Sequence, residues 1–364
     1  MKRYYFYLAI IAFLFLSCSK AGQGDLLEIP INIDHTVTLP LSEIAEEIIA
    51  VELEFTDESM LSPEFIRNII ITEKEVLIAR MEKIYVFSRE GKFIRSIGSK
   101  GQGPGEYLGI MRFAFNEKNR QLYINSTPKI ISYDINGKFL KETKVFSGVF
   151  RDINYFNEEL LLLIDNVYND KNGVYSRPQL YRLNDSLRVI DSCTIMNLYF
   201  GDRYPPTHRF HSDYILKGNK SVYLYYGDFT WRTRNNLREK VFSDTLYRFE
   251  NNHIIPELKL KFKNDEVSNF INLFNIYRSS RYTFVIYNKV YNPALTYFFC
   301  FDTKTGKGYN IQDGYTDDIN QIKEPVVIRP FNLDTEMFYY LHTHMKPGDL
   351  EEPNPTLYIG RLKK

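Results

Sequence analysis

A repeated hairpin constrains the fold of this chain more than any other feature of its sequence. The stretch YVFSREGKFIRSIG, Tyr85 to Gly98, aligns without a gap with ISYDINGKFLKETK, Ile131 to Lys144. Each copy has a tight-turn glycine, Gly91 or Gly137, and the two glycines are 46 residues apart. Because a four-stranded propeller blade takes about 40 to 50 residues, this spacing predicts a repeating fold built from β-hairpins.

Weaker copies of the hairpin follow along the chain. They are LYRLNDSLRVIDS, TLYRFENNHIIPEL and CFDTKTGKGYNI, which begin at Leu180, Thr245 and Cys300. With the two strong copies they make five outer hairpins, and the segment from Pro325 to Lys364 contains strands for a sixth unit. Since closing a ring removes exposed sheet edges, we expect IIAVELEF, Ile48 to Phe55, to supply the closing strand.

The predicted fold class is all-β: a six-bladed β-propeller of four-stranded antiparallel blades, closed by an N-terminal strand. A seven-bladed ring or a pair of sandwiches are the alternatives. The 28 Tyr and 27 Phe residues suit a sheet-rich core. The 46 basic and 45 acidic residues give a formal net charge of +1, which provides no general attraction to nucleic acid. No nucleic-acid partner is therefore predicted.

The N-terminus predicts export. Lys2 and Arg3 precede an apolar run that ends at Leu16, followed by Ser17 and Cys18. This order is typical of a signal peptide, and a cysteine directly after it resembles the lipidation site of bacterial lipoproteins. We expect an acyl anchor on Cys18 that holds the protein at a membrane, facing the periplasm or exposed on the outer-membrane surface. Plain secretion and an uncleaved anchor are the alternatives. The predicted domains are 1–17 signal peptide, 18–38 anchor and linker, and 39–364 a single, monomeric propeller.

A glycine-rich loop, GSKGQGPGEYLGI, suggests a phosphate cradle at first sight. Such a cradle needs a helix directly after the loop, or Gly-Lys followed by Ser or Thr, and the following stretch LGIMRFAF instead predicts a strand. We interpret the loop as a structural crossing between neighbouring blades, in which glycines allow irregular backbone angles and proline stiffens the path. The residues of this predicted turn loop are Gly101, Gly103, Pro104 and Gly105.

Three stretches together resemble a known family. GKFIRSIGSKGQGPGEY, LPLSEIAEEIIAVELEF and FSDTLYRFENNHIIPELKLKF are similar to sequences of the six-bladed β-propeller lipoproteins of Bacteroidota, which resemble NHL-repeat propellers. The resemblance spans nearly all of the mature chain and implies a fold and a cell-envelope location. It also implies a role in outer-membrane nutrient uptake with a transport protein as partner, but it implies no particular activity.

Arginines recur at the start of the predicted innermost strands, EFIRNI, GIMRFA and VFRDIN. Propellers bind ligands where these strands converge, and the planar guanidinium grips a carboxylate at two points. We therefore predict a cationic ring around the channel mouth that binds an anionic group, such as an acidic sugar or peptide. The alternative is that these arginines are solvated, or paired with acids such as Asp152 and Glu106. The predicted ligand-binding residues are Arg67, Arg112, Arg151, His208, Arg209, His211 and Arg329.

Other chemistry has weaker support in the sequence. The pairs His208 with His211 and His342 with His344 suggest a metal, but surface or packing histidines are the default interpretation. Cys193 and Cys300 lie in strand-like stretches, where they either pair or behave as small buried side chains. Neither a nucleophile with a paired base nor a repeated set of acidic ligands is recognisable. No cofactor, metal or catalytic residue is predicted.

The function predicted from the sequence is that of a binding or interaction module. Its ligand would be a small molecule, a glycan fragment or a protein partner. The alternative is an enzyme of lactonase or lyase type on the same scaffold, since function depends on the site and not on the fold.

Overall fold

The structure is a computed structural model dominated by β-strands. Within its described part, one four-residue α-helix, α2 (Leu41–Ile44), and two 3-10 turns, η1 (Pro63–Phe65) and η2 (Asp265–Asn269), accompany thirty strands. No helix of that part is long and apolar enough to cross a membrane. The residues described are 26–126, 128–144, 148–171, 173–201, 213–218, 220–227, 229–232, 238–263, 265–345 and 353–364.

Four of the sheets contain four antiparallel strands each. In three of them the strands follow one another along the chain: β3 (Asn68–Ile71), β4 (Glu75–Ala79), β5 (Ile84–Ser88) and β6 (Phe93–Ile97); β7 (Arg112–Asn116), β8 (Gln121–Ser126), β9 (Lys129–Asp134) and β10 (Phe139–Lys144); β22 (Ile271–Arg278), β23 (Tyr282–Lys289), β24 (Asn292–Asp302) and β25 (Lys307–Gln312).

The fourth of these sheets joins the two ends of the chain. The N-terminal strand β2 (Ala45–Glu52) pairs antiparallel with β30 (Thr356–Leu362), so that Ile49 lies opposite Ile359. The remaining strands of this sheet are β28 (Arg329–Asn332) and β29 (Met337–His342). The segment Ile48 to Phe55, expected to add a strand at this place, lies partly in β2.

Two further sheets contain five strands. In one of them, β1 (Leu27–Ile31) pairs in parallel with β21, so part of the expected linker 18–38 is a strand. This sheet contains β1, β21 (His253–Phe262), β20 (Thr245–Glu250), β17 (Val222–Leu224) and β16 (Ile215–Lys217). The other contains β11 (Val149–Phe156), β12 (Glu159–Asp170), β13 (Gly173–Leu183), β14 (Val189–Thr194) and β15 (Leu198–Gly201). Two-stranded hairpins β18 (Phe229–Arg232) with β19 (Arg238–Val241), and β26 (Tyr315–Asp317) with β27 (Ile322–Val326), stand apart from them.

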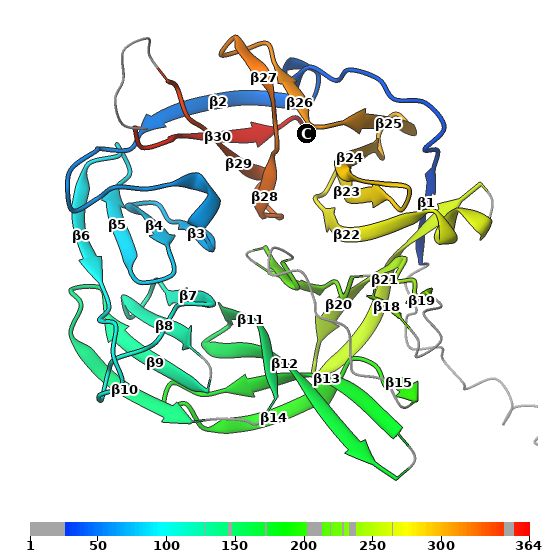
Figure 1. Cartoon of the computed structure of the whole chain (residues 1–364). Coiled ribbons are helices and arrows are strands. Elements are labelled where there is room, and N and C mark those ends of the chain that lie inside the picture. The colour runs from blue at the N-terminus through cyan, green and yellow to red at the C-terminus, as the bar shows by residue number, and fades with distance from the viewer. Residues whose placement is uncertain are drawn as a thin grey trace, which may run out of the picture.

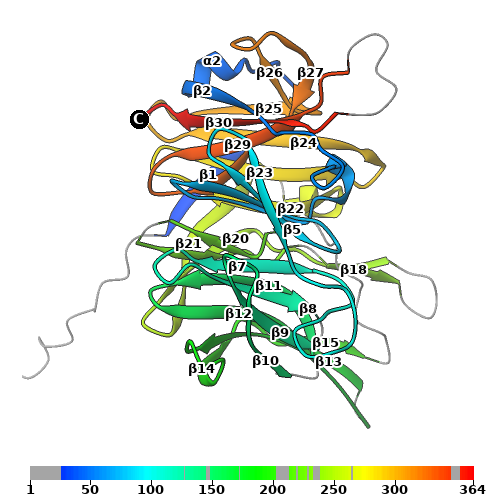
Figure 2. The same ribbon diagram turned by 90° about the vertical axis from the view of Figure 1, so that its left-hand side faces the viewer.

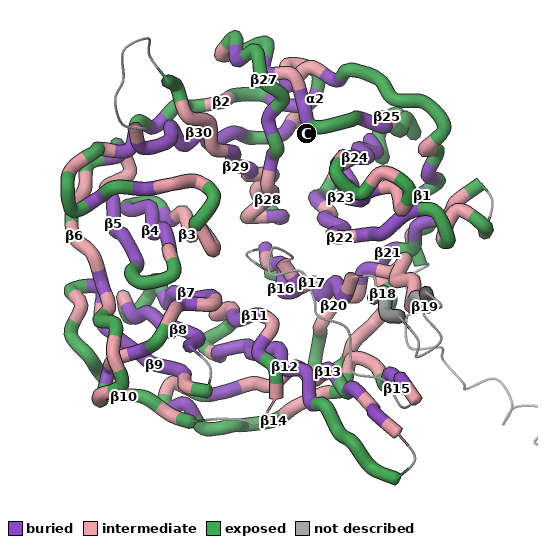
Figure 3. The backbone as a smooth tube through the Cα atoms, viewed as in Figure 1, coloured by how far each residue is buried: buried purple, intermediate pink, exposed green. Residues whose placement is uncertain are grey.

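The sheets are arranged around a common centre, as in a β-propeller (Figure 1). The strands β3, β7, β11, β22 and β28 lie nearest to that centre, and the view turned by 90° shows the sheets as stacked layers (Figure 2). Figure 3 adds β16 to the strands around the centre. The structure thus confirms the coarse prediction of an all-β, propeller-like fold with four-stranded antiparallel sheets.

The apolar core lies between neighbouring sheets, and β4 shows why. Its five residues are all buried (Figure 3). Leu77 packs into a cluster shared with Phe113 and Leu122 of the next sheet, whereas Ile78 packs into a cluster with Leu357 of the sheet before. Because successive side chains of a strand point to opposite faces, a strand covered on both faces is apolar throughout.

The hairpin repeat of the sequence forms repeated hairpins in space. All five predicted copies coincide with adjacent antiparallel strands, β5–β6, β9–β10, β13–β14, β20–β21 and β24–β25. The two strong copies have the same turn, since Gly91 and Gly137 have φ angles of 88° and 87°. Their backbone N–H groups donate to the carbonyls of Ser88 and Asp134, each at 3.0 Å. Only glycine adopts such angles without strain.

The glycine-rich loop connects β6 to β7, which belong to neighbouring sheets. Two of its N–H groups are bound by carboxylates: Gly103 donates to Glu106 at 2.8 Å and Gly105 donates to Glu142 at 3.0 Å. A side chain on Gly101 would come within 2.1 Å of the Glu106 carboxylate. Amides that already hold protein carboxylates do not form an empty phosphate cradle, and Pro104 lies between these two bonded glycines.

The two turn glycines provide a matched test of how the N-terminal strand packs. A Cβ on Gly91 would lie 2.0 Å from the carbonyl oxygen of Glu52, whereas a Cβ on Gly137 would meet nothing closer than 3.9 Å. Both alanine variants should lose about 1 kcal/mol from the positive φ. Gly91→Ala should lose roughly 1–3 kcal/mol more, because the backbone after β2 must move. Urea unfolding monitored by circular dichroism measures the difference, and equal losses would contradict this packing.

Candidate functional site

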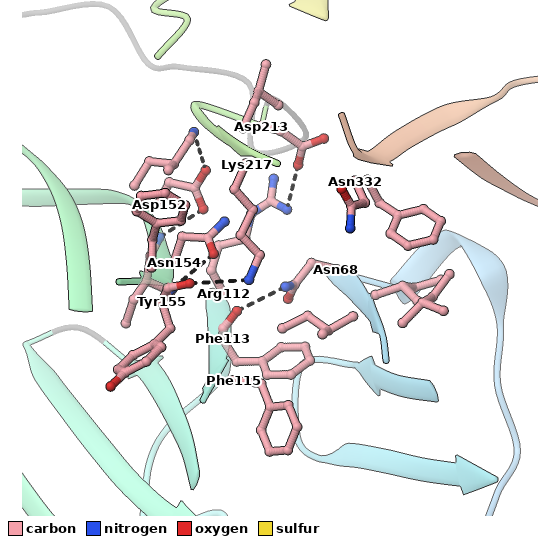
Figure 4. Close-up of a pocket in the computed structure, with 18 of the residues that line it drawn as sticks. Asn68, Arg112, Phe113, Phe115, Asp152, Asn154, Tyr155, Asp213, Lys217 and Asn332 are labelled. Atoms are coloured by element: carbon pink, nitrogen blue, oxygen red, sulfur yellow. Dashed lines mark hydrogen bonds and ion pairs between the residues drawn. The ribbon is translucent and has the colours of Figure 1, made fainter. Parts of the chain in front are cut away.

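The centre of the molecule contains a cavity of about 420 Å³. Its walls come from the innermost edge strands of five sheets and the residues next to them (Figure 4). This volume is in the range of small-molecule sites in proteins. The strands that line it are β3, β7, β11, β16 and β28, together with Asp213 and with Tyr339 of β29.

Three of the predicted arginines line this one cavity. Arg67 precedes β3, Arg112 is the first residue of β7, and Arg329 is the first residue of β28. The sequence predicted Arg67 and Arg112 here because they hold similar places in an innermost strand, and it predicted Arg329 from the last unit of the repeat. Two carboxylates, those of Asp152 and Asp213, lie among them. The sequence named Asp152 as an acid that could pair with the arginines, but it did not single out Asp213.

Arg112 is buried and paired. Its Nη1 donates to Asp213 Oδ1 and to the carbonyl oxygen of Arg67, at 3.1 Å each (Figure 4). Burial by itself lowers the pKa of Arg112, but the charges of Asp213 and Asp152 outweigh burial and hold this pKa above its usual value. Arg112 is therefore a permanently charged group whose charge the protein itself largely balances.

Asp213 connects two sheets through its carboxylate. One oxygen accepts from Arg112 and the other accepts from the hydroxyl of Tyr277 at 2.9 Å. Tyr277 lies on β22, so Asp213 links β22 to β7 across the centre. Burial raises the pKa of Tyr277 well above its ordinary value, and the charge of Asp213 adds to this effect. Tyr277 therefore acts as a hydrogen-bond donor at any physiological pH.

Asp152 is the most strongly perturbed acid of the cavity. Burial raises the pKa of its carboxyl to about 6, although Arg112 acts in the opposite direction. One oxygen accepts from the N–H of Ile153, and the other accepts from the N–H groups of Tyr214 and Ile215, all at 2.9 Å. Asp152 thus fixes the segment after Asp213 onto β11, and it gains a proton within an accessible pH range.

The guanidinium groups of Arg67 and Arg329 differ from that of Arg112, because they make no hydrogen bond or ion pair within the described residues. The Nε atom of Arg67 is buried without any partner. Burial lowers the pKa of Arg329, but the charges of Tyr339 and Asp213 outweigh burial and hold this pKa above its usual value. Arg329 therefore stays charged. Two cationic groups therefore face the cavity with unused hydrogen-bond donors.

Arg151 points elsewhere. Its guanidinium binds Asp165 of β12 at 2.6 and 2.8 Å, and it is not among the residues that line the cavity. The register of β11 against β12 shifts between Phe150 and Asp152. Such a bulge changes which side chains face which way, so Asp152 and not Arg151 reaches the cavity.

Lys217, the last residue of β16, lies further along the cavity. Its Nζ donates to the carbonyl oxygen of Tyr155 at 3.2 Å (Figure 4). It makes no ion pair within the described part of the chain. Burial lowers the pKa of Lys217, while the charge of Glu117 opposes this effect.

Several predicted residues lie outside the described part of the chain. They are His208, Arg209 and His211 of the expected ligand ring, and Cys18 of the expected lipid anchor. The stretch HRFHSDY that contains the two histidines ends in Asp213 and Tyr214, which are described and lie at the cavity and beside it.

The second histidine pair lies away from the cavity. The rings of His342 and His344 are 4.5 Å apart, and His344 shares a hydrogen bond of 2.7 Å with the hydroxyl of Tyr358. Among the residues that the structure describes, no group of three or more His, Cys, Asp and Glu residues could hold a metal ion. Cys193 and Cys300 are both free thiols.

Sequence reasoning did not single out Asp213, Lys217 and Tyr339, which line the cavity. It named Asp152, which directly follows Arg151, only as an acid that could pair with the arginines. Asp213 and Lys217 belong to the short strand β16 and the residues before it, where the sequence has no strong strand pattern. A search for ionisable residues at the start of each innermost strand would have found Asp213.

The chain matches one protein family over residues 26–353. The family is described as "Domain of unknown function (DUF4934)". The chain belongs to this family. Its match begins at residue 26 and therefore includes strand β1 as well as every strand that lines the cavity. A search of curated proteins gives no significant match.

Solved structures similar to this DUF4934 chain include the "Putative exported protein" of Bacteroides fragilis. That structure has 17% sequence identity and a TM-score of 0.63, and the match covers 93% of this chain and 100% of the other. At this identity the likeness shows the fold alone. Two others are the WD40 domain of Neurospora crassa Pan2 (12% identity, TM-score 0.44, covering 82% and 76%) and a protein of unknown function from Bacteroides caccae (10%, 0.40, covering 74% and 82%).

The pair of Arg112 and Asp213 can be tested with a double-mutant cycle. Asp213→Asn leaves a buried guanidinium without its counter-charge and should cost about 2–3 kcal/mol of stability. Arg112→Met should cost about 1–3 kcal/mol, because Asp213 is partly exposed and keeps Tyr277. The loss of stability in the double variant should be smaller than the sum of the two single losses, by roughly 1 kcal/mol or more. Additive losses in urea unfolding would show that the two side chains do not interact.

Proposed function

We propose that this protein is a binding module whose central cavity takes a small anionic ligand, held by Arg67 and Arg329. The observation that carries the proposal is the difference among the three arginines. Asp213 balances Arg112, whereas the other two guanidinium groups line the same cavity without a hydrogen bond from the described residues. A carboxylate on the ligand would supply the hydrogen-bond acceptors that these two guanidinium groups lack.

The energetics favour an anionic ligand. A charged group that leaves water without a partner loses hydration free energy, and a hydrogen-bonded counter-ion restores much of it. Arginine is suited to this role, since its fork binds both oxygens of a carboxylate. The ligand therefore gains hydrogen bonds that are stronger than those between neutral groups, about 1.5–3 kcal/mol each.

Titration calorimetry with a simple carboxylate such as propionate tests the proposal. Arg67→Met and Arg329→Met should each weaken binding by about tenfold or more, since each removes charged hydrogen bonds. Arg188→Met is the matched control, because Arg188 is an exposed residue next to β14 and is not among the residues that line the cavity. Carboxylate binding that survives in the double variant Arg67→Met/Arg329→Met would overturn the proposed site.

Anion affinity should rise as the pH falls from 7.5 to 5. The carboxyl of Asp152, with its pKa raised to about 6, is charged above that pH and neutral below it. Protonation removes one negative charge beside three arginines, so an anion binds more tightly at low pH. A sulfonate such as methanesulfonate should serve as the probe, because its own charge stays constant. We expect an increase of roughly threefold to tenfold in the calorimetric affinity.

Asp152→Asn is the control for this pH dependence. Its affinity for the sulfonate should change little with pH if Asp152 causes the effect. Any dependence that remains belongs to other groups. An affinity that stays constant or falls toward pH 5 in the natural protein would contradict the assignment.

We also propose the finer form of the fold, a six-bladed propeller whose ring is closed by β2. Six sheets of four or five strands among the described residues support this proposal. The pairing of the N-terminal strand β2 with the C-terminal strand β30 supports it as well, because such pairing removes a free sheet edge.

We further propose that the protein is exported and anchored to a membrane through an acyl group on Cys18. The charged and apolar N-terminus supports export, as does the fold shared with the "Putative exported protein" of Bacteroides fragilis. An anchor at residue 18 would hold the cavity near the membrane surface, where an outer-membrane transport protein is the candidate partner.

Metabolic labelling with an alkyne analogue of palmitate tests the anchor. The natural chain should incorporate the label and fractionate with membranes, and Cys18→Ser should lose both properties because no thiol remains at the site. Cys193→Ser is the control, since Cys193 is a free thiol of the folded domain, and it should keep the label. Label retained in Cys18→Ser would exclude lipidation at this residue.

A further inference from the structure

Lys217 is a further cationic side chain of the cavity, apart from the arginines. Its Nζ uses one of its three N–H bonds, to the carbonyl oxygen of Tyr155. The charge of Glu117 acts on Lys217, but the two residues make no ion pair within the described residues. Lys217 is half-buried, and two of its donors are available to a ligand.

The arginines and Lys217 are separated along the inner strands. Asp152, which acts on Arg112 through its charge, and Tyr155, which binds Lys217, are both on β11. Three residues of an extended strand span roughly 10 Å. The β11 residues that act on Arg112 and bind Lys217 are therefore about 10 Å apart, and Arg67, Arg329 and Lys217 all line the same cavity.

The cavity has unused hydrogen-bond donors on Arg67, Arg329, Lys217 and Asn154, while Asn68 Oδ1 is an acceptor without a partner among the described residues. Asp152 already accepts three backbone N–H groups, and Asp213 already accepts from Arg112 and Tyr277. Between the two ends, Asn154 accepts an N–H with its oxygen, and its amide nitrogen makes no hydrogen bond in the described structure. A ligand that satisfies the unused donors at the two ends must offer acceptor oxygens at both ends.

We propose that the natural ligand is a dicarboxylic acid, with one carboxylate at Arg67 and Arg329 and the other at Lys217. This inference rests on the proposed function, because the first carboxylate occupies the same arginine end. The second carboxylate gives the lysine an ion-pair partner, which it lacks among the described residues although the charge of Glu117 acts on it. Binding at that end also favours the protonated amine against the effect of burial.

Calorimetry with two matched series of ligands tests the proposal. Straight-chain dicarboxylates of four to twelve carbons are compared with monocarboxylates of the same chain length, using the purified protein. Dicarboxylates long enough to reach both ends should bind about tenfold more tightly than their monocarboxylate counterparts, and shorter ones should show no such advantage. Lys217→Met should bring the affinity of the long dicarboxylates down to that of the monocarboxylates.

A control and the alternative outcomes separate this inference from the proposed function. Lys138→Met changes an exposed lysine of a hairpin turn and should keep the dicarboxylate advantage. If monocarboxylates bind but no dicarboxylate binds more tightly, or if Lys217→Met keeps the advantage, the dicarboxylate inference is wrong and the anion site remains. If neither series binds, both the inference and the proposed function are wrong.

Discussion

The fold depends on covering both faces of every inner sheet with apolar side chains. On β4, Leu77 packs into one cluster and Ile78 into another, and the two clusters belong to the two neighbouring sheets. Sheets that are each packed between two neighbours stack around a common axis, and the free edge of the innermost strand of each sheet faces that axis. Polar and charged residues at those edges therefore meet at the centre, although they are far apart in the sequence.

The centre is a set of charges that the protein balances only in part. Arg112 and Asp213 satisfy each other, and Asp152 uses its carboxylate to hold the backbone of the segment that carries Asp213. Buried charges are tolerated when they are paired and hydrogen-bonded, and Arg112, Asp152 and Asp213 meet this condition with groups of the protein itself. Arg67, Arg329 and Lys217 lack such partners among the described residues, so the cavity wall carries cationic groups with unused hydrogen-bond donors.

The sequence predicted the hairpins better than the site. The turns at Gly91 and Gly137 are specified by nearest neighbours, and their identical angles follow from the same local residues. Arg67 and Arg112 were predicted to converge because strand order in a repeating fold places equivalent residues together, and both line the cavity with Arg329. Arg151 departs from that rule because β11 contains a register shift, which depends on its pairing with β12 and leaves no mark in the local sequence.

By itself, the sequence determined the all-β class, the repeated hairpins and the arginines at the starts of inner strands, since turn residues, side-chain alternation and repeat length act over short distances. Only the tertiary structure decided which charges neutralise one another. Asp213 reaches both Arg112 of β7 and Tyr277 of β22, and Lys217 reaches Tyr155 of β11. These contacts join residues of different sheets across the centre, and their distances are set by how the sheets pack, which no local pattern encodes.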